Sequence, residues 1–324
     1  MYLSNENTLP ERYKNALPQF VDTQVEQGQW ERTDGKFLHY RYVLNPEAKA
    51  WIVIMQGRAE SAAKYTELME ELYQNAYSVF TFDHIGQGQS SRLTENPQHG
   101  YINDFDDYVL DANDLVTKVI QALRMQHKQA NTPQYLLAHS MGGAIATMFL
   151  HRYPNVFDKA VLCSPMYKIQ SPIPEAAARH LVSAGAQMQQ ILGIQSGYFL
   201  GQDDFETVDF SDNKLTSCQV RYEWFRGYYH DNIEQRLGGV TFQWLAAALS
   251  AMEYIEQNAK EIVTPILGFR AMADEIVDNP EIEKIFTDFS HAHLVDIEGA
   301  KHEILFEKDK LRHEALKQIL AFFV

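Results

Sequence analysis

Residues 135–150 read YLLAHSMGGAIATMFL, and this stretch decides the fold. It begins in a short apolar run of strand length, residues 134–138, and continues after Ser140 with apolar positions at helical spacing. A serine at such a junction is held in strained backbone geometry that exposes its hydroxyl, and it needs small residues two positions away on either side. Ala138 and Gly142 are those residues. The stretch therefore predicts a buried strand, a nucleophile elbow and a helix.

A plainer interpretation of the same stretch makes Ser140 the N-cap of the helix that we expect over residues 141–153. The usual pattern of a nucleophile elbow is G-x-S-x-G, and Ala138 departs from it at the first glycine. The departure is small because a methyl group is the smallest possible addition to glycine. Whether Ser140 is a cap or a nucleophile therefore depends on whether an acid and a base follow it in the chain.

Two later strands each lead into a polar residue of the required type. Residues 264–274, TPILGFRAMAD, predict a buried strand followed by Asp274, and residues 292–302, AHLVDIEGAKH, predict a strand, a glycine turn and His302. Carboxyl ends of parallel strands meet at one edge of a sheet, so these residues can converge with Ser140. One known order of a catalytic triad along the chain is serine, acid, histidine. In such a triad His302 would accept the serine proton and Asp274 would orient the imidazole.

Three carboxylates compete for the role of the acid, namely Asp274, Glu275 and Asp278. Asp278 has a structural explanation, because it precedes Asn279 and Pro280, and one of the first two is expected to cap a helix over residues 280–289. Glu275 points away from the site if Asp274 points into it. We therefore favour Asp274.

An earlier stretch, WIVIMQGRA at residues 51–59, predicts a buried strand that runs into a glycine turn. The oxyanion of an acyl-transfer reaction needs two backbone N–H donors, one from the residue after the nucleophile and one from the loop after such an early strand. Met141 and Arg58 occupy these positions. The competing interpretation is that Gln56 and Gly57 form an ordinary turn.

Five motifs, taken together, resemble the monoacylglycerol lipase and lysophospholipase branch of the α/β-hydrolases, and most of all the bacterial lysophospholipases of the L-two type. The resemblance covers the chain from about residue 30 to its end. It implies an α/β-hydrolase fold, and the motifs that carry it are QGRAES at 56–61, DHIGQGQS at 83–90, HGYINDFDDYVLD at 99–111, HSMGG at 139–143 and GAKHEILFEKD at 299–309.

The resemblance also implies roles for single residues and two departures from the pattern. Gln56 stands where the lipases usually have a histidine, and Ala138 replaces the first elbow glycine. The lysophospholipase type tolerates both, which favours it over the monoacylglycerol lipases. Carried onto this chain, the implied site is Ser140 as nucleophile, Asp274 as acid, His302 as base, and Arg58 and Met141 as oxyanion donors.

The alternation of strand-like and helix-like stretches breaks between residues 166 and 258. This segment has prolines at 172 and 174 and an aromatic-rich stretch, RYEWFRGYYHDN, at residues 221–232. We expect residues 1–165 and 259–324 to form one core with a mostly parallel sheet covered by helices on both faces. Residues 166–258 are then an inserted, mainly helical cap over Ser140.

Aromatic and cationic side chains of the cap are the expected substrate contacts. Trp224, Phe225 and Tyr228 are placed to line an acyl channel, as are Tyr222, Tyr229 and Trp244. The alternative is that these aromatics are plain core. Candidates for binding a lipid phosphate are Arg221 and, with it, Arg179, Arg226 and Arg236, each of which has a solvated cap surface as its alternative.

Composition restricts the partners of the 324-residue chain. The formal net charge of −15 argues against nucleic acid and against electrostatic docking to anionic lipid, so any membrane contact is expected to be apolar. The N-terminus has no signal-peptide pattern, no run reaches eighteen apolar residues, and Cys163 and Cys218 are too few for a disulfide framework. We expect a cytoplasmic protein that touches the inner membrane from that side at most.

No cofactor is expected, and no metal either, because His291 and His293 lack a third ligand in the sequence. The predicted function is a serine hydrolase that cleaves the carboxylic ester of a single-chain lipid, foremost a lysophospholipid, through an acyl-enzyme. Alternatives within enzymes are a monoacylglycerol lipase, a small-ester carboxylesterase or a peptidase. A different class is a binding protein with a hydrolase fold and no turnover. The sequence does not indicate the oligomeric state.

Overall fold

The computed structural model describes residues 1–171, 173 and 175–324, so the two prolines at 172 and 174 lie outside the described residues. Within that part of the chain, eight strands form one sheet in the order β1-β2-β4-β3-β5-β6-β7-β8. The strands are β1 (Val25–Glu31), β2 (Phe37–Val43), β3 (Ala50–Met55), β4 (Tyr77–Phe82), β5 (Gln134–His139), β6 (Lys159–Cys163), β7 (Ile266–Ala271) and β8 (Ala292–Ile297).

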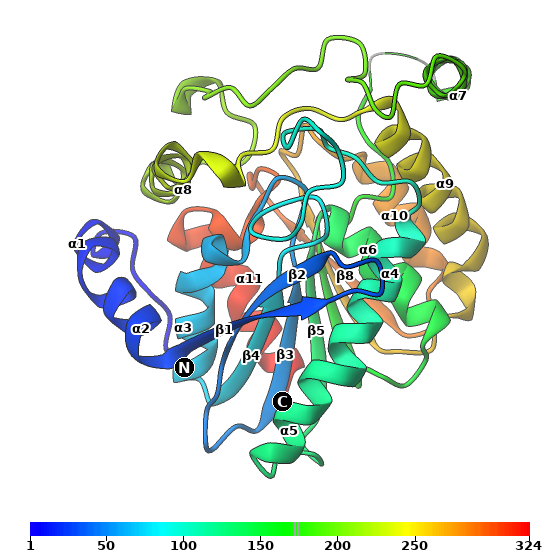
Figure 1. Cartoon of the computed structure of the whole chain (residues 1–324). Helices are drawn as coiled ribbons and strands as arrows, with labels where there is room; N and C mark the ends of the chain where they lie inside the picture. The colour runs from blue at the N-terminus through cyan, green and yellow to red at the C-terminus, as the bar shows by residue number, and fades with distance from the viewer. Residues whose placement is uncertain (172, 174) are drawn as a thin grey trace.

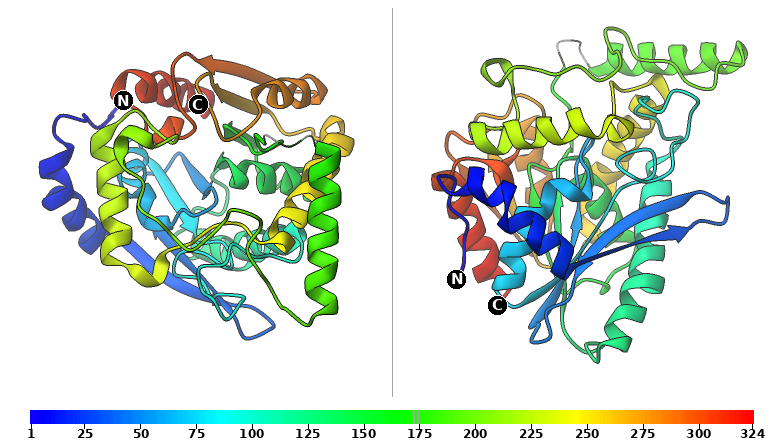
Figure 2. Two further views of the ribbon diagram at one scale, coloured as in Figure 1. Left: turned by 90° about the horizontal axis from the view of Figure 1, so that it is seen from above. Right: turned by 60° about the vertical axis from the view of Figure 1, so that its left-hand side comes forward.

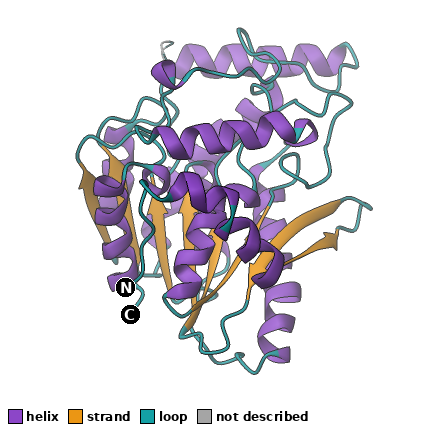
Figure 3. Cartoon of the chain, turned by 90° about the vertical axis from the view of Figure 1, so that its left-hand side faces the viewer, coloured by secondary structure: helices purple, strands orange, loops and turns teal. Residues whose placement is uncertain are grey.

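The parallel part of the sheet is covered by helices, and the antiparallel edge is more exposed. β1, β2 and β4 pair antiparallel, and β4, β3, β5, β6, β7 and β8 pair parallel. Every residue of β3, β4 and β5 is buried, as expected for parallel strands with helices on both faces. β1 is mostly exposed, and with β2 it forms a hairpin that projects from the side of the molecule (Figure 3).

Helices cover both faces of this sheet, which confirms the predicted mostly parallel α/β architecture (Figure 1). One apolar core lies between the sheet and α4, α6, α9 and α10, and the other lies between the sheet and α3 and α11. The helices are α1 (Leu9–Lys14), α2 (Ala16–Gln24), α3 (Thr66–Gln74), α4 (Phe105–Asp114), α5 (Gln121–Gln126), α6 (Met141–Arg152), α7 (Glu175–Ile191), α8 (Gln219–Asp231), α9 (Phe242–Asn258), α10 (Asn279–Asp288) and α11 (Asp309–Phe322).

Short helical segments complete the chain. A π-helical segment, Leu115–Ile120, joins α4 to α5. The 3₁₀ segments are Ala62–Tyr65, Phe210–Asp212, Ile233–Gln235, Ala259–Glu261 and Ile304–Phe306. Among the helices that the structure describes, none combines the length and the apolar character needed to cross a membrane.

The segment between β6 and β7 contains α7, α8 and α9. Seen from above, α7 and α8 lie on opposite sides of the molecule, over the carboxyl edge of the sheet (Figure 2). α9 differs from them, because Trp244, Ala248, Ala251 and Ile255 on it belong to the core cluster that also contains α6. The division of the chain at residue 258 stays a prediction, and the packing of α9 favours a cap that ends before residue 242.

Candidate active site

Ser140 joins β5 to α6 in a backbone conformation that non-glycine residues rarely adopt, with φ 52° and ψ −118°. Such strain persists only where surrounding bonds impose it. The Ser140 N–H donates to the Cys163 carbonyl at 3.1 Å, and its carbonyl accepts from the N–H groups of Gly143 and Met166, both at 2.9 Å. The Ser140 side chain makes no cap hydrogen bond. The geometry is therefore that of an elbow, and the hydroxyl is not occupied by capping α6.

The two small neighbours of Ser140 have different reasons to be small. A Cβ on Gly142 would lie 2.2 Å from the Met55 carbonyl oxygen and 2.5 Å from that of Gln56, so only glycine fits there. Ala138 is fully buried in β5, where its methyl group is accommodated. The departure from G-x-S-x-G thus falls at the position that tolerates a methyl group.

His302 stands between Ser140 and Asp274 in a chain of two hydrogen bonds. Its Nε2 lies 2.8 Å from the Ser140 Oγ, and its Nδ1 lies 2.7 Å from the Asp274 Oδ2. The other Asp274 oxygen accepts from the N–H groups of Ile276 at 2.7 Å and Val277 at 3.1 Å. The side chains of Ser140, His302 and Asp274 are all buried. The arrangement can carry a proton from the serine to the imidazole while the carboxylate holds the ring in one orientation.

Electrostatics keep the acid ionised. Burial raises the pKa of Asp274, but its hydrogen bonds to His302 and to the N–H groups of Ile276 and Val277 outweigh burial, and the pKa falls below its ordinary value. The competing carboxylates lie elsewhere. Asp278 accepts from the Glu281 N–H at 2.9 Å and caps α10, as predicted. Glu275 pairs with Lys214 at 3.2 Å in a largely exposed ion pair.

The turn after β3 lies against Ser140. A Cβ on Gly57 would lie 3.0 Å from the Nδ1 of His139, the residue before the serine. The Gly57 N–H donates to the Glu60 Oε2 at 2.6 Å, so Glu60 anchors this turn. Among the described residues, the N–H groups of Arg58 and Met141 have no hydrogen-bond acceptor. Two unused N–H groups beside a serine are what an oxyanion hole requires.

A buried cluster of charges lies behind Ser140, His302 and Asp274, and it was not predicted from the sequence. The Lys64 Nζ lies 2.6 Å from the Glu60 Oε1 and 2.5 Å from the Glu303 Oε1, and Glu303 follows His302 in the chain. The His139 ring contacts both Glu60, at 3.4 Å, and the carbonyl oxygen of His302, at 3.2 Å. Burial lowers the pKa of His139, but the Glu60 carboxylate outweighs it and the pKa is raised. Lys64 lies four residues after Glu60, and this spacing was a usable hint.

The aromatic residues of α8 divide between two sides of the helix. The Tyr229 hydroxyl donates to the Ala59 carbonyl at 2.8 Å, and the Phe225 ring centroid lies 4.5 Å from the Lys64 Nζ. Trp224 faces another way and stacks on Tyr13 of the segment before β1, with ring centroids 4.7 Å apart. Of the predicted acyl contacts on α8, the structure brings Tyr229 and Phe225 close to the turn beside Ser140. Trp224 packs on the N-terminal segment, and Tyr228 hydrogen-bonds to Gln235 at 2.9 Å.

Arg221 requires a correction, because it is neither a ligand-facing nor a solvated cap residue. Its Nε and Nη2 donate to the Glu67 carboxylate of α3, and Nη2 also donates to Asp309 of α11 at 2.9 Å. Its Nη1 donates to the Glu307 carbonyl oxygen at 2.7 Å. With all three nitrogens occupied in a buried setting, Arg221 fastens α8 to the core and leaves no donor for a phosphate.

The remaining cap arginines also have contacts. Arg179 lies 3.3 Å from Glu253, and Arg236 donates to the carbonyl oxygens of Tyr229 and His230. The Arg226 guanidinium lies over the ring of Tyr222, 5.1 Å from its centroid.

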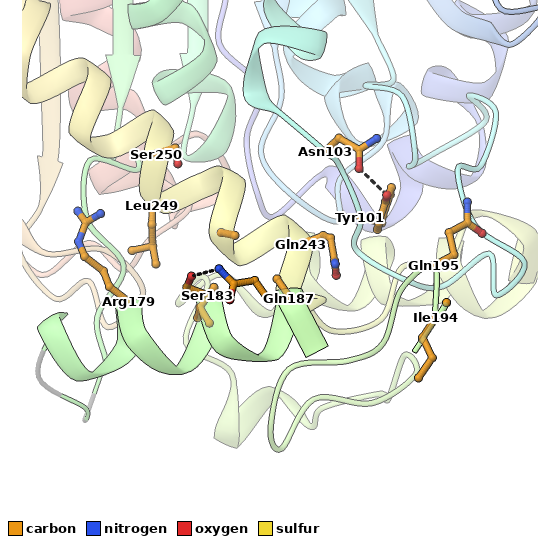
Figure 4. Close-up of a pocket in the computed structure, with 14 residues that line it drawn as sticks. Tyr101, Asn103, Arg179, Ser183, Gln187, Ile194, Gln195, Gln243, Leu249 and Ser250 are labelled. Atoms are coloured by element: carbon orange, nitrogen blue, oxygen red, sulfur yellow. Dashed lines mark hydrogen bonds between the residues drawn. The ribbon is translucent and has the colours of Figure 1, made fainter. Parts of the chain in front are cut away.

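A cavity of about 750 Å³ lies between α7 and α9 and not at the triad (Figure 4). Its lining includes Tyr101, Asn103, Arg179, Gln187 and Leu249, and it includes none of Ser140, Asp274 and His302. Within the described ranges, no three His, Cys, Asp or Glu side chains converge in a way that could hold a metal ion.

Comparisons with known proteins identify relatives of this chain. A family model described as serine aminopeptidase, S33, matches residues 46–309. The chain is 36% identical to the probable lysophospholipase L2 of Haemophilus influenzae, covering 88% of each chain. It is also 36% identical to lysophospholipase L2 of Escherichia coli K12, covering 84% of this chain and 79% of that one. Human monoglyceride lipase is 29% identical over 76% of this chain and 72% of its own length.

Solved structures give the same fold. A soluble variant of the monoglyceride lipase of Saccharomyces cerevisiae superposes with a TM-score of 0.70 at 19% identity, covering 93% of this chain and 95% of that one. A carboxyl esterase of Bacillus coagulans gives a TM-score of 0.67 at 15% identity, with 93% and 98% covered. The predicted α/β-hydrolase fold and the predicted resemblance are thereby confirmed.

Proposed function

Since the chain belongs to the serine aminopeptidase S33 family of α/β-hydrolases, we propose that it is a serine hydrolase that cleaves the carboxylic ester of a single-chain lipid, foremost a lysophospholipid. The observation that carries the chemistry is the hydrogen-bonded chain from the Ser140 Oγ through His302 to Asp274. A binding protein without turnover has no use for this arrangement or for the strained elbow that presents the hydroxyl.

The reaction proceeds by four proton transfers, all through the imidazole of His302. The Ser140 Oγ attacks the ester carbonyl carbon while the His302 Nε2 takes the hydroxyl proton. The resulting oxyanion accepts hydrogen bonds from the N–H groups of Arg58 and Met141. His302 then gives the proton to the departing alcohol oxygen, which leaves an acyl-serine. A water that loses its proton to His302 attacks this acyl group, and the fatty acid leaves as His302 returns the proton to Ser140.

The names of the relatives and the physics of extraction support a single-chain substrate. Two of the relatives at 36% identity are named lysophospholipase L2, and a more distant one is named monoglyceride lipase. Each further CH₂ drawn from an acyl phase costs about 0.8 kcal/mol, so a lipid with one chain reaches a buried serine far more easily than a lipid with two. A monoacylglycerol is the second candidate, which the name of the human relative favours.

We place the protein in the cytoplasm, with a peripheral contact to the inner membrane through the end of α7. Ile191 is 84% exposed, Leu192 64% and Met188 59%, and these apolar side chains can enter the boundary between head groups and acyl chains. An apolar contact suits a chain of net charge −15, which anionic lipids repel.

Active-site labelling followed by a substrate panel tests the proposal. A fluorophosphonate should label the wild-type protein and should fail to label Ser140→Ala. The panel compares a lysophospholipid, a monoacylglycerol of the same acyl chain, a short ester and a peptide with a free N-terminus. Highest kcat/KM for the lysophospholipid supports the proposal. Highest kcat/KM for the monoacylglycerol, the short ester or the peptide contradicts the substrate and leaves the serine chemistry intact.

A further inference from the structure

The side chain of Arg58 is a part-buried cation without a carboxylate partner, beside the turn that flanks Ser140. Its Nη2 donates to the carbonyl oxygen of Gly238, and its guanidinium carbon lies 5.5 Å from the ring centroid of Trp244. Its Nε is shielded from solvent and has no acceptor among the described residues. Arginine is rarely buried unless it is paired, so the unused donors need an explanation.

Arg312 and Arg92 bond more fully than Arg58, although the Nε atoms of Arg41, Arg124 and Arg226 are also shielded and without an acceptor. Arg312 donates to both oxygens of Glu71, at 2.7 and 2.6 Å, and to the Leu305 carbonyl oxygen at 2.7 Å. Arg92, which lies near the cap, donates to the carbonyl oxygens of Gly86, Gly88 and Glu234. Arg58 differs from Arg312 and Arg92 in having one printed hydrogen-bond acceptor, and it differs from the other arginines with a free Nε in following Gly57 in the turn that lies against Ser140.

The backbone around the Arg58 guanidinium is fitted closely to it. A Cβ on Gly100 would lie 2.6 Å from the Nη2 of Arg58. Gly100 is itself held in place, because its N–H donates to the Gly239 carbonyl at 3.0 Å and its carbonyl accepts from the Thr241 N–H at 3.0 Å. The guanidinium is therefore fixed between the loop at residue 100 and the segment that returns from the cap, before any ligand arrives.

No nearby negative charge competes for this cation. Burial lowers the pKa of Arg58 to about 10, which leaves it charged at neutral pH, and the groups that act on it electrostatically are the phenols of Tyr108 and Tyr198. No ion pair joins Arg58 to an acidic side chain in the part of the chain that the structure describes. In a chain of net charge −15, such a site offers an anion a positive charge at short range.

We propose that the Arg58 side chain binds the phosphate of the substrate head group and so selects lysophospholipids over uncharged esters. This inference rests on the proposed function, and it adds the residue that determines specificity. Arginine suits the task because its planar fork can donate two parallel hydrogen bonds to one phosphate.

The dimensions of substrate and residue agree. Six bonds separate the carbonyl carbon of a 1-acyl lysophospholipid from its phosphorus, a span of about 7 Å at ordinary bond lengths. Five bonds separate the Cα of Arg58 from its guanidinium carbon, a span of about 6 Å when extended. With its N–H at the oxyanion, Arg58 can therefore reach the phosphate of the same molecule with its side chain. One residue would then hold both the reacting carbonyl and the head group.

The test is the ratio of kcat/KM for a lysophosphatidylcholine to that for a monoacylglycerol of the same acyl chain, both below their micelle concentrations. Arg58→Gln keeps the backbone N–H and removes the charge, and we expect it to lower this ratio roughly 10- to 100-fold, the range of a lost hydrogen bond to a charged group. Arg58→Lys keeps the charge without the fork and should recover part of the ratio. Arg92→Gln removes another cation, whose Nη1 and Nη2 donate to backbone carbonyl oxygens, and it should leave the ratio as in the wild type.

The outcomes distinguish a failure of this inference from a failure of the proposed function. A wild-type protein that prefers the monoacylglycerol contradicts both. A wild-type preference for the lysophospholipid that Arg58→Gln does not change overturns this inference alone. So does an equal loss for both lipids, because it means that Arg58 only shapes the oxyanion turn. Thermal melting verifies that each variant is folded, and if Arg58→Gln does not fold, Arg58→Lys carries the comparison.

Discussion

Replacing Lys64 by methionine should destabilise the folded protein more than replacing any charged residue on the surface. Lys64 is only 3% exposed and is shared between Glu60 and Glu303, at 2.6 and 2.5 Å. Methionine has similar length and no charge, so Lys64→Met leaves two carboxylates buried without their cation. Breaking a buried ion pair by removing one partner costs about 3–5 kcal/mol. At about 2.1 cal/mol/K of unfolding entropy per residue, the melting temperature of this chain should fall by roughly 4–8 °C.

We also expect the catalytic activity of the folded Lys64→Met variant to be lower than that of the wild type. Glu60 also accepts the Gly57 N–H at 2.6 Å, and Glu303 follows the histidine of the triad. Repulsion between the two carboxylates will displace the oxyanion turn, the loop of His302, or both. We therefore expect a lower kcat for a short soluble ester at a temperature where the variant is still folded, with KM much less affected, because the transition state depends most on the oxyanion donors.

The pH dependence of this loss has a definite sign. The Glu60 carboxyl is deeply buried, which raises its pKa, but Lys64 and His139 outweigh burial and hold the pKa well below its ordinary value. A depressed pKa contributes stability above the unfolded value, and that contribution is lost as pH falls through the folded one. Without Lys64 the pKa rises, so the carboxyl is protonated at higher pH. The difference in melting temperature between wild type and Lys64→Met should accordingly be larger at pH 8 than at pH 5.

A surface lysine supplies the matched control. Lys284 also pairs with two carboxylates, Glu256 at 2.5 Å and Glu281 at 2.9 Å, but its side chain is 52% exposed. Exposed pairs contribute about 0–1 kcal/mol, so Lys284→Met should lower the melting temperature by a degree or two at most. Calorimetry of both variants at the two pH values checks the reasoning. Equal losses for Lys64→Met and Lys284→Met, or a loss at Lys64 that does not depend on pH, would refute it.

Three further predictions concern single carboxyl and hydroxyl groups. Ser140→Ala should lower kcat on the order of a million-fold and abolish fluorophosphonate labelling, and persistent labelling would exclude Ser140 as the nucleophile. Asp274→Asn should cost roughly 10⁴-fold in kcat because the amide favours the wrong imidazole tautomer, whereas Asp278→Asn should keep its turnover because asparagine caps a helix as well as aspartate does. Burial raises the pKa of Asp111 to about 7 even though Arg32 lies 3.3 Å away. The folded state thus holds a proton that the unfolded chain releases near pH 4, so stability falls as pH rises from about 4 to about 7 and is level above that. Asp111→Asn should therefore raise the melting temperature more at pH 8 than at pH 5, and an equal gain at both would contradict the assignment.

The elbow and the candidate triad could be predicted because their information is local. Ser140, Asp274 and His302 each follow a strand that is apolar enough to recognise, and parallel strands bring their carboxyl ends together whatever the loops between them do. The choice between Asp274 and Asp278 was likewise decided by a local rule, since an aspartate before Asn-Pro is placed to cap a helix. Boundaries were less accurate. β7 spans Ile266–Ala271, so it begins and ends inside the stretch 264–274 from which it was predicted.

What the sequence could not supply depends on contacts across long stretches of chain. Arg221 meets Glu67 and Asp309, which are 154 and 88 residues away, so nothing near it in sequence indicated that it is buried. The same holds for Lys64, whose contact with Glu60 was within reach of a spacing rule but whose contact with Glu303 was not. Ion pairs of this kind are set by which helices pack together, and periodicity describes only one helix at a time.

Arg58 shows a different limit of sequence reasoning, because that reasoning considered its backbone N–H and left its side chain aside. The motif assigns a role to its backbone N–H, and any side chain serves a backbone donor equally well. The surroundings of the side chain are set by the chain near Gly100 and near Gly238, which are 42 and 180 residues away. These segments enclose the guanidinium and leave its Nε without an acceptor. An unsatisfied buried donor is costly, and at Arg58 it belongs to the turn beside Ser140, where the phosphate of a bound lipid would supply an acceptor.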